Sequence, residues 1–235
     1  MRRSTRLIGC LAALLWVGYA ANQAWAFPDF AQKTKVACAA CHTNPAGGAA
    51  LTDAGKAYKE DATKVPEAVK GADYVGSNKC MMCHGMGKYK ELKATYLASK
   101  HAKAFSALSG DPKAIAAMAA KFKIELKGAA DKSDACVRCH VTGFKLAGGY
   151  PAADSAKTAA VTNVGCEACH GPGSLHLAAK TPADKKATIN RAVTENLCTH
   201  CHVSEVTPKF DFEAMKKAGV HVAVVAAAPA APEKK

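Results

Sequence analysis

The pattern Cys-x-x-Cys-His occurs five times in this sequence of 235 residues and uses every cysteine except Cys10. Two thiols at this spacing can form thioether bonds to the vinyl groups of a haem, and the histidine that follows is placed under the iron as its proximal ligand. The sequence therefore predicts five covalently bound haem c groups. The attachment cysteines are Cys38, Cys41, Cys80, Cys83, Cys136, Cys139, Cys166, Cys169, Cys198 and Cys201, and the proximal histidines are His42, His84, His140, His170 and His202.

Two other uses of paired cysteines fit the pattern less well. Two Cys-x-x-Cys pairs can close a tetrahedral zinc site, but zinc gives no reason for a histidine to follow the second cysteine every time. A disulfide framework suits an exported chain, yet its cysteines would be scattered rather than repeated at one spacing. Haem attachment accounts for both the spacing and the histidine.

The start of the chain has the order of a secretory signal peptide. Three arginines give a basic start, an apolar run covers residues 7–21, and Ala24-Trp25-Ala26 supplies a small-x-small cleavage site. The run is shorter than the roughly 20 residues that a helix needs to cross a bilayer. We therefore expect residues 1–26, Cys10 included, to be removed on export to the periplasm or the extracellular face of a Gram-negative-type bacterium. No integral membrane span is expected.

The chain is basic, with a formal net charge of +13. Loss of Arg2, Arg3 and Arg6 with the signal peptide lowers this charge to +10, and the propionates of the haems cancel much of the remainder. Basic residues are spread along the chain without an arginine-rich cluster or interleaved aromatics, which argues against nucleic-acid binding. We expect the lysines to lie near propionates and to contact acidic redox partner proteins.

The composition also indicates the fold class. Few aromatic residues and much alanine, glycine and lysine leave little material for an aliphatic core, so the haems must supply much of it. We predict a mainly α fold with long loops, packed around haems, with little or no β-sheet. Helices are expected at 89–108, at 113–126 after an Asp111 N-cap with Pro112 at the first helical position, and at 211–218. The turn between the first two predicts a helical hairpin.

Most of the chain, from Tyr74 to His221, resembles the tetrahaem cytochromes of the c-554 type, a family of electron carriers. The segments YVGSNKCMMCH, SKHAKAF, CVRCHVTGF, VGCEACHGPGSLH and CTHCH follow one another in the family's order, and GCEACHGPGSLH is the most specific of them. The resemblance implies a helix-and-loop fold with mostly bis-histidine haems stacked in close, near-parallel pairs. It also implies that His101 and His176 are distal ligands, and that His176 crosses to a neighbouring haem.

The resemblance and the composition divide the chain into segments. Residues 27–72 hold the motif CAACH with a turn after it, and they look like a haem module added in front of the c-554-like tetrahaem domain, 73–222. Residues 223–235 are rich in alanine and proline and are expected to be a disordered tail.

Four histidines lie outside the motifs and are the candidate distal ligands: His101, His176, His200 and His221. Since His200 lies inside its own Cys-x-x-Cys loop, it cannot reach that haem's iron and would have to bind a neighbouring haem in this chain or in another copy. Five six-coordinate haems need five distal ligands, so the chain is one histidine short. We expect the haem of His42 to be the one left over, with Met86, Met215, a water, the Phe27 α-amine, a histidine of another subunit, or nothing as its sixth ligand.

These features favour an exported electron carrier, because filling both axial positions of most haems blocks substrate binding. One alternative is a haem enzyme that converts a small nitrogen compound (nitric oxide, hydroxylamine or nitrite) or peroxide at the under-ligated haem. The other is a subunit of an extracellular cytochrome assembly, a homo-oligomer or filament, in which His200 and the first haem extend the haem chain between copies. The motifs contain no dedicated acid-base cluster beside a haem, which favours the carrier.

The haem count is the first testable prediction. Mass spectrometry of the mature, fully processed chain should give the mass of residues 27–235 plus five haems. Cys166→Ala should impair attachment at one motif and lower the yield of folded protein, because folding is coupled to insertion of the group. A mature mass with four haems or fewer would contradict the prediction.

Overall fold

The computed structural model describes residues 28–218, which form short helices joined by long loops. The described range contains no β-strand, only isolated bridges between His42 and Leu51 and between Val141 and Thr162, so the predicted mainly α class is confirmed. The α-helices are α1 (Pro28–Thr34), α2 (Cys38–Cys41), α3 (Asp53–Glu60), α4 (Ser77–His84), α5 (Lys90–Ala98), α6 (Pro112–Lys121), α7 (Asp134–Val137), α8 (Ser155–Val161), α9 (Cys166–His170), α10 (Ser174–Ala178), α11 (Pro182–Ala187), α12 (Glu195–Thr199) and α13 (Phe212–Lys217). The 3-10 helices are η1 (Gly87–Tyr89), η2 (His101–Lys103), η3 (Phe105–Ser109) and η4 (Ala130–Lys132).

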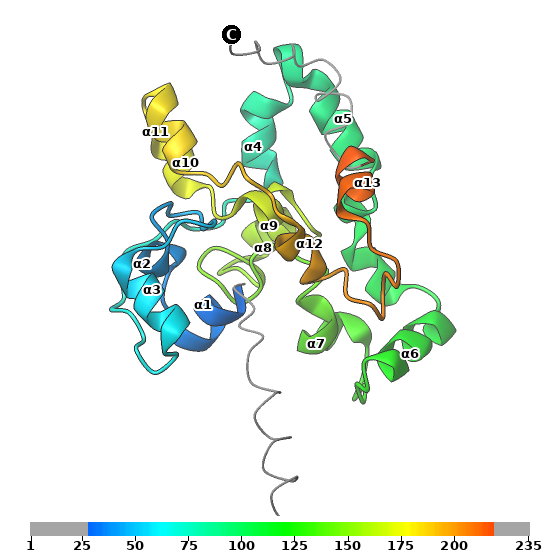
Figure 1. The fold of residues 1–235 in the computed structure, drawn as a ribbon. Helices are drawn as coiled ribbons and strands as arrows, with labels where there is room; N and C mark the ends of the chain where they lie inside the picture. The colour runs from blue at the N-terminus through cyan, green and yellow to red at the C-terminus, as the bar shows by residue number, and fades with distance from the viewer. Residues whose placement is uncertain (1–27, 219–235) are drawn as a thin grey trace, which may run out of the picture.

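The helices surround a central group of elements. Figure 1 shows α8, α9 and α12 near the middle of the molecule, with α1, α2 and α3 on one side and α5, α6 and α13 on the other. No helix between residues 28 and 218 has both the length and the apolar character needed to span a membrane. The predicted signal peptide, His221 and the predicted tail lie outside the described residues.

Several helix ends follow the sequence signals. The Asp111 carboxylate accepts a hydrogen bond from Lys113 N at 3.0 Å at the start of α6, and the Asp211 carboxylate accepts one from Ala214 N at 2.9 Å at the start of α13. Such bonds satisfy backbone donors that the first helical turn leaves unpaired. The helix predicted to run to residue 126 ends at Lys121, because Lys123 adopts a left-handed φ of 55°.

The continuous helix predicted over 89–108 is wrong. α5 ends at Ala98, Ser99 is extended with a ψ of 157°, and the chain continues as 3-10 turns, so His101 lies at the start of η2. Tertiary hydrogen bonds replace the helical ones here: Val164 N donates to the His101 carbonyl at 3.1 Å, and Phe105 N donates to the Asn163 side chain at 2.9 Å. α5 and α6 lie at different heights on their side of the molecule (Figure 1), and the predicted hairpin is not formed.

The apolar core is small for a chain of this length. One cluster of buried residues packs η3 and η4 against the loop after α7, and its members are Leu108, Ala130, Val137, Val141 and Phe144. Large apolar side chains elsewhere stay exposed, among them Met82 at 61%, Leu97 at 50% and Leu177 at 42%. Burying apolar surface is the main stabilising contribution in folding, and these exposed side chains leave apolar surface for a prosthetic group to cover.

A buried carboxylate links three segments at the centre. Glu167 is only 2% exposed, and its oxygens accept hydrogen bonds from Gly76 N at 2.7 Å, Gly173 N at 2.7 Å and Val75 N at 3.0 Å. Burial raises the pKa of this carboxyl group, while the backbone donors oppose the shift. Because Gly76 caps α4 and Gly173 caps α10, the Glu167 clamp fixes where both helices begin relative to α9.

The Glu167 clamp generates a stability prediction. Glu167→Ala would leave buried N–H groups of Gly76 and Gly173 without an acceptor, and we expect it to lower the free energy of unfolding of the haem-loaded protein by about 2–4 kcal/mol. Glu167→Gln keeps one acceptor oxygen and should cost less. Denaturant unfolding measures both variants against Glu213→Gln, an exposed position on α13, which should stay within about 0.5 kcal/mol of the parent. Unfolding of Glu167→Ala at the parent's midpoint would contradict the clamp.

Candidate haem sites

Each Cys-x-x-Cys-His motif forms a helical turn. The turns lie in α2, α4 and α9 and at the ends of α7 and α12, and within them His42 N donates to Cys38 O at 2.8 Å and His202 N donates to Cys198 O at 2.9 Å. Residues three and four positions apart share one face of a helix, so a turn brings both sulfurs and the imidazole to the same side. No disulfide joins the ten motif cysteines, all of which lie in the described range. The local geometry therefore suits attachment of a flat group by two thioethers and one imidazole.

Backbone carbonyls orient several of the imidazoles. The Nδ1 atom of His140 lies 2.6 Å from Ala104 O, that of His170 lies 2.7 Å from Asn190 O, and that of His176 lies 2.7 Å from Lys185 O. A carbonyl can only accept, so Nδ1 must carry the proton and Nε2 presents its lone pair. Histidine ligands of metals commonly use this arrangement, which fixes the tautomer and the ring plane.

His202 and His42 differ from these three. The His202 Nδ1 atom lies 3.1 Å from the Thr207 hydroxyl, which can act as donor or acceptor. The His42 Nδ1 atom is buried without a hydrogen-bond partner, and burial lowers the pKa of this imidazole, which favours its neutral form. In the first motif, the Nδ1 atom of the ring is thus not held by a backbone carbonyl as it is in His140 and His170.

Two pairs of histidines face each other across a gap. The ring centroids of His84 on α4 and His176 on α10 are 6.3 Å apart with 28° between the ring planes, and those of His101 on η2 and His202 after α12 are 6.0 Å apart at 73°. Metal–nitrogen bonds of about 2 Å on both sides of one iron place two ring centroids about 6 Å apart. Each pair joins a predicted proximal histidine to a predicted distal one, at a separation that fits an iron between them.

One ring of each pair lies in an environment that favours the neutral form. Partial burial lowers the pKa of His84, and the neighbouring His176 lowers it further. Partial burial likewise lowers the pKa of His101, with a contribution from His202. Desolvation and a nearby positive group both disfavour a charged imidazole, so the surroundings of His84 and His101 favour the neutral form that can bind a metal.

Cysteines of different motifs lie next to one another. A side-chain hydrogen bond between Cys80 and Cys166 raises the pKa of the Cys80 thiol and lowers that of Cys166 to about 7. A hydrogen bond to Cys139 likewise raises the pKa of Cys201. Burial, together with the nearby Cys198, raises the pKa of Cys169 to about 11. These contacts arrange the last four motifs in the spatial order 80–84, 166–170, 198–202 and 136–140.

The first motif contacts this row at the 166–170 motif. Asn44, two residues after His42, donates from Nδ2 to Ile189 O at 3.0 Å, and the next carbonyl, that of Asn190, holds the His170 ring. Gly171 has a φ of 76°, and a side chain at this position would collide with the carbonyl of Ala46. Only glycine allows the turn after His170 to approach the first motif so closely.

The remaining candidates are less well defined. His200 is half-buried inside the 198–202 motif and belongs to neither ring pair, and His221 lies outside the described residues. Met86 and Met215 are 61% and 45% exposed, and no contact brings either to His42. The sequence marked Asn44 only as part of the turn after His42, and it did not single out Glu167 or Asn190. Nothing in their spacing signals a role, because each acts through a backbone partner far along the chain.

Comparison with known proteins agrees with this geometry. Residues 79–171 match the family described as cytochrome c554 and c-prime, and the chain is 39% identical over 102 residues to cytochrome c-554 of Nitrosomonas europaea. This part of the chain is therefore similar to the c-554 type of multihaem cytochrome. The alignment covers 43% of this chain and 40% of the relative's length, so the c-554 match spans less than half of either protein. No solved structure matches the chain.

The c-554 match includes three of the five motifs. The motifs at 80–84, 136–140 and 166–170 lie inside residues 79–171, whereas those at 38–42 and 198–202 lie outside. His101 also lies within the match, and His176 lies just beyond it. The first motif, which docks on the 166–170 motif through Asn44, is therefore outside the part of the chain shared with the c-554 family.

The Asn44 contact generates a prediction about this docking. Asn44→Ala removes the bond to Ile189 O and a second bond from Ala46 N at 2.9 Å, so we expect the free energy of unfolding of the haem-loaded protein to fall by about 1–3 kcal/mol. Limited proteolysis should also cut faster in the loop at residues 61–70. Asn196→Ala, at an exposed position on α12, serves as the control. Identical stability and cleavage of the two variants would show that Asn44 does not hold the first motif in place.

Proposed function

We propose that this chain is an exported pentahaem c-type cytochrome that carries electrons between redox partner proteins. The observation that carries the proposal is the spacing of the two imidazole pairs, 6.3 Å for His84 and His176 and 6.0 Å for His101 and His202. An iron held between two imidazoles has no open position for a substrate, whereas it can still gain and lose one electron. An electron carrier needs an iron that changes its oxidation state but does not bind substrate.

The chain's own residues would supply attachment, orientation and exclusion of water. The ten motif cysteines would hold five haems by thioether bonds, with His42, His84, His140, His170 and His202 as proximal ligands. His101 and His176 would be distal ligands, and His200 and His221 remain the other candidates. When bound, the haems supply one-electron chemistry between ferric and ferrous iron. The carbonyls of Ala104, Asn190 and Lys185 would hold three of the rings in the ligating tautomer and thereby tune the potentials.

The arrangement of the motifs supports transfer along the chain. Neighbouring motifs share cysteine contacts, from 80–84 through 166–170 and 198–202 to 136–140. The first motif joins at 166–170 through Asn44 and Gly171. We infer a row of four haems with a fifth haem at its side. The 27–72 module would then exchange electrons with an interior haem of the row rather than with a haem at its end. The domain limits of 1–26, 27–72, 73–222 and 223–235, and location in the periplasm or on the extracellular face, belong to the same proposal.

The histidine count favours one alternative for a single haem. Four histidines outside the motifs can complete at most four of five irons within one chain, and the His42 ring has no partner on Nδ1. If the iron above His42 is open, it can bind nitric oxide or a similar small molecule, and the protein would add a slow enzymatic activity to its carrier role.

Replacement of the distal histidines tests the proposal. His176→Ala should convert the haem of His84, and His101→Ala that of His202, from low to high spin, and each variant should gain one carbon monoxide site because the sixth position is vacated. Electron paramagnetic resonance of the oxidised protein and carbon monoxide titration measure the change. Lys180→Ala, an exposed position between α10 and α11, should alter neither.

The number of bis-histidine haems in the unmodified protein is a second test. As an isolated monomer the protein should contain at least one iron that is not bis-histidine; binding of carbon monoxide by that iron favours the enzymatic alternative, and a raised potential favours methionine ligation. Unchanged spectra in both histidine variants would exclude the ring pairs as iron ligands. Five bis-histidine haems in a proven monomer would exclude the open site.

A further inference from the structure

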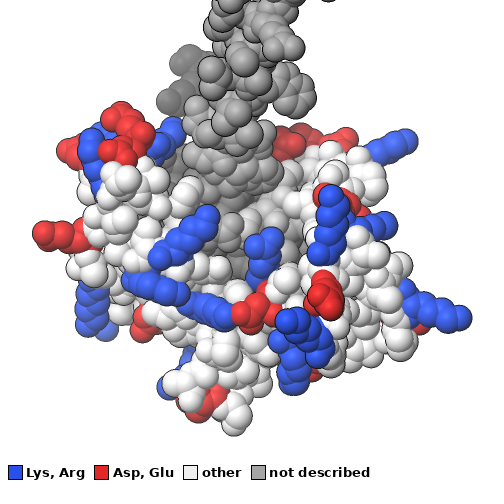
Figure 2. Space-filling model, turned by 90° about the horizontal axis from the view of Figure 1, so that it is seen from below, with Lys and Arg blue, Asp and Glu red and all other residues white. Residues whose placement is uncertain are grey.

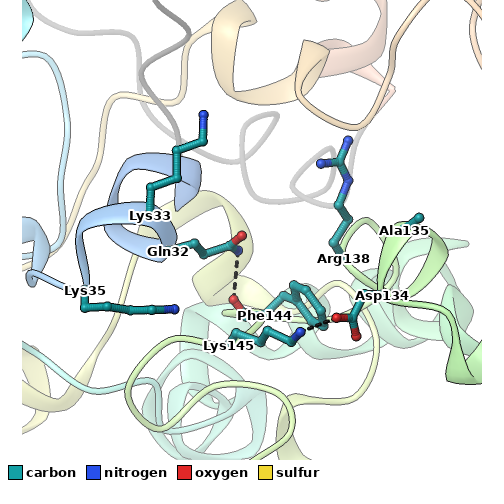
Figure 3. A pocket seen from close by; sticks show the side chains of 8 residues that line it. All are labelled: Gln32, Lys33, Lys35, Asp134, Ala135, Arg138, Phe144 and Lys145. Atoms are coloured by element: carbon teal, nitrogen blue, oxygen red, sulfur yellow. Dashed lines mark hydrogen bonds and ion pairs between the residues drawn. The ribbon is translucent and has the colours of Figure 1, made fainter. Parts of the chain in front are cut away.

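A cavity of about 480 Å³ lies between α1 and α7. Lys33 and Lys35 line it from the α1 side, Arg138 lines it from the facing α7 side, and Phe144 and Lys145 lie between them (Figure 3). The remaining lining residues are Gln32, Asp134 and Ala135. None of the lining residues is a cysteine or histidine of a motif, so the cavity lies beside the 136–140 motif rather than over its ligands.

The cavity is strongly basic. Four cationic side chains line it against one carboxylate, that of Asp134, and Asp134 is already paired with Lys145. Among the described residues, no carboxylate pairs with Lys33, Lys35 or Arg138. The view from below, onto the side of the molecule that carries α1 and α7, shows Lys and Arg side chains standing out from this face with Asp and Glu side chains among them (Figure 2). The cavity is therefore complementary to an anionic group from outside.

The position of the cavity connects it to one haem site. Ala135 precedes Cys136, and Arg138 lies between Cys136 and Cys139 in the 136–140 motif. The 136–140 motif ends the row of four motifs described above. A partner bound here would thus lie beside the haem at the end of the row. From that haem, an electron could pass to each neighbouring haem in turn.

The cavity is formed only because the N-terminal module packs against the rest of the chain. Gln32 on α1 donates to Phe144 O at 2.8 Å and so fixes α1 opposite α7. Its two lysines come from a segment outside residues 79–171, the part matched by the c-554 family. The added module therefore contributes half of the cations of the cavity.

We propose that this cavity, lined by Lys33, Lys35, Arg138 and Lys145, is the docking site for an acidic one-electron carrier protein, whose carboxylates pair with these cations. The inference rests on the proposed electron-carrier function and names the partner's chemistry. In the bound complex one electron would pass between the partner's redox centre and a haem held by the 136–140 motif, so that one would be oxidised as the other is reduced, and no proton or further reactant is needed. Opposite charges at such a surface raise the association rate and fix the orientation.

The test uses two variants with the same change of net charge. Lys33→Glu with Lys35→Glu reverses two cations of the cavity, whereas Lys56→Glu with Lys59→Glu reverses two exposed lysines on α3. A fluorescein-labelled hexaglutamate peptide is titrated into each haem-loaded protein at low salt. We expect the first variant to raise the dissociation constant about tenfold and the second to change it less than twofold. The peptide should also slow reduction of the parent by reduced flavodoxin, an acidic electron carrier.

Three results would overturn the proposal. Equal weakening by both variants would mean that only net charge matters. Failure of the unmodified protein to bind the peptide would mean that the cavity does not bind carboxylates of another molecule. A change of haem potentials without a change in peptide binding would mean that Lys33 and Lys35 serve the protein's own propionates. Haem content and spin state of the same samples are measured in parallel, so loss of the electron-carrier function itself is recognised separately.

Discussion

The hydrogen bonds of Glu167 are the interaction on which the central sites depend. This carboxylate lies within the 166–170 motif and is buried, and it accepts from the backbone at the starts of α4 and α10. α4 carries His84 and α10 carries His176, so the separation of these two rings is set by where the two helices begin. A charged group buried at this depth is costly unless donors surround it. Here the donors are main-chain N–H groups, which cannot rotate away, and the two helices are held accordingly.

The small apolar core has a related consequence. The cluster around Leu108 and Val137 stabilises only the segment from η3 to the loop after α7, and the short helices elsewhere have few turns over which to bury an apolar face. Short isolated helices are marginal in water. The elements that carry the motifs would therefore gain stability from the proposed haems, which would couple folding to haem attachment.

The sequence predicts the parts of the structure that depend on local signals. The motif turns, the Asp111 and Asp211 caps and the absence of strands from the described residues all follow from short segments. The break at Ser99 does not, because residues 163 and 164 provide the hydrogen bonds that replace the helix, and they lie about sixty positions away along the chain. The same limit applies to the sites: five motifs and four spare histidines could be counted, but the pairing of His84 with His176 depends on the tertiary fold. The roles of Asn44 and Glu167 escaped notice for this reason.

The two contacts that fasten the N-terminal module share a chemical feature. Gln32 and Asn44 both donate from side-chain amides, and the acceptors are the main-chain carbonyls of Phe144 and Ile189. A carbonyl is present at every position whatever the side chain, so substitutions at 144 and 189 that preserve the backbone leave these acceptors in place. Attachment through main-chain acceptors thus makes these two contacts insensitive to the side chains at 144 and 189, whereas the close approach at residue 171 depends on glycine.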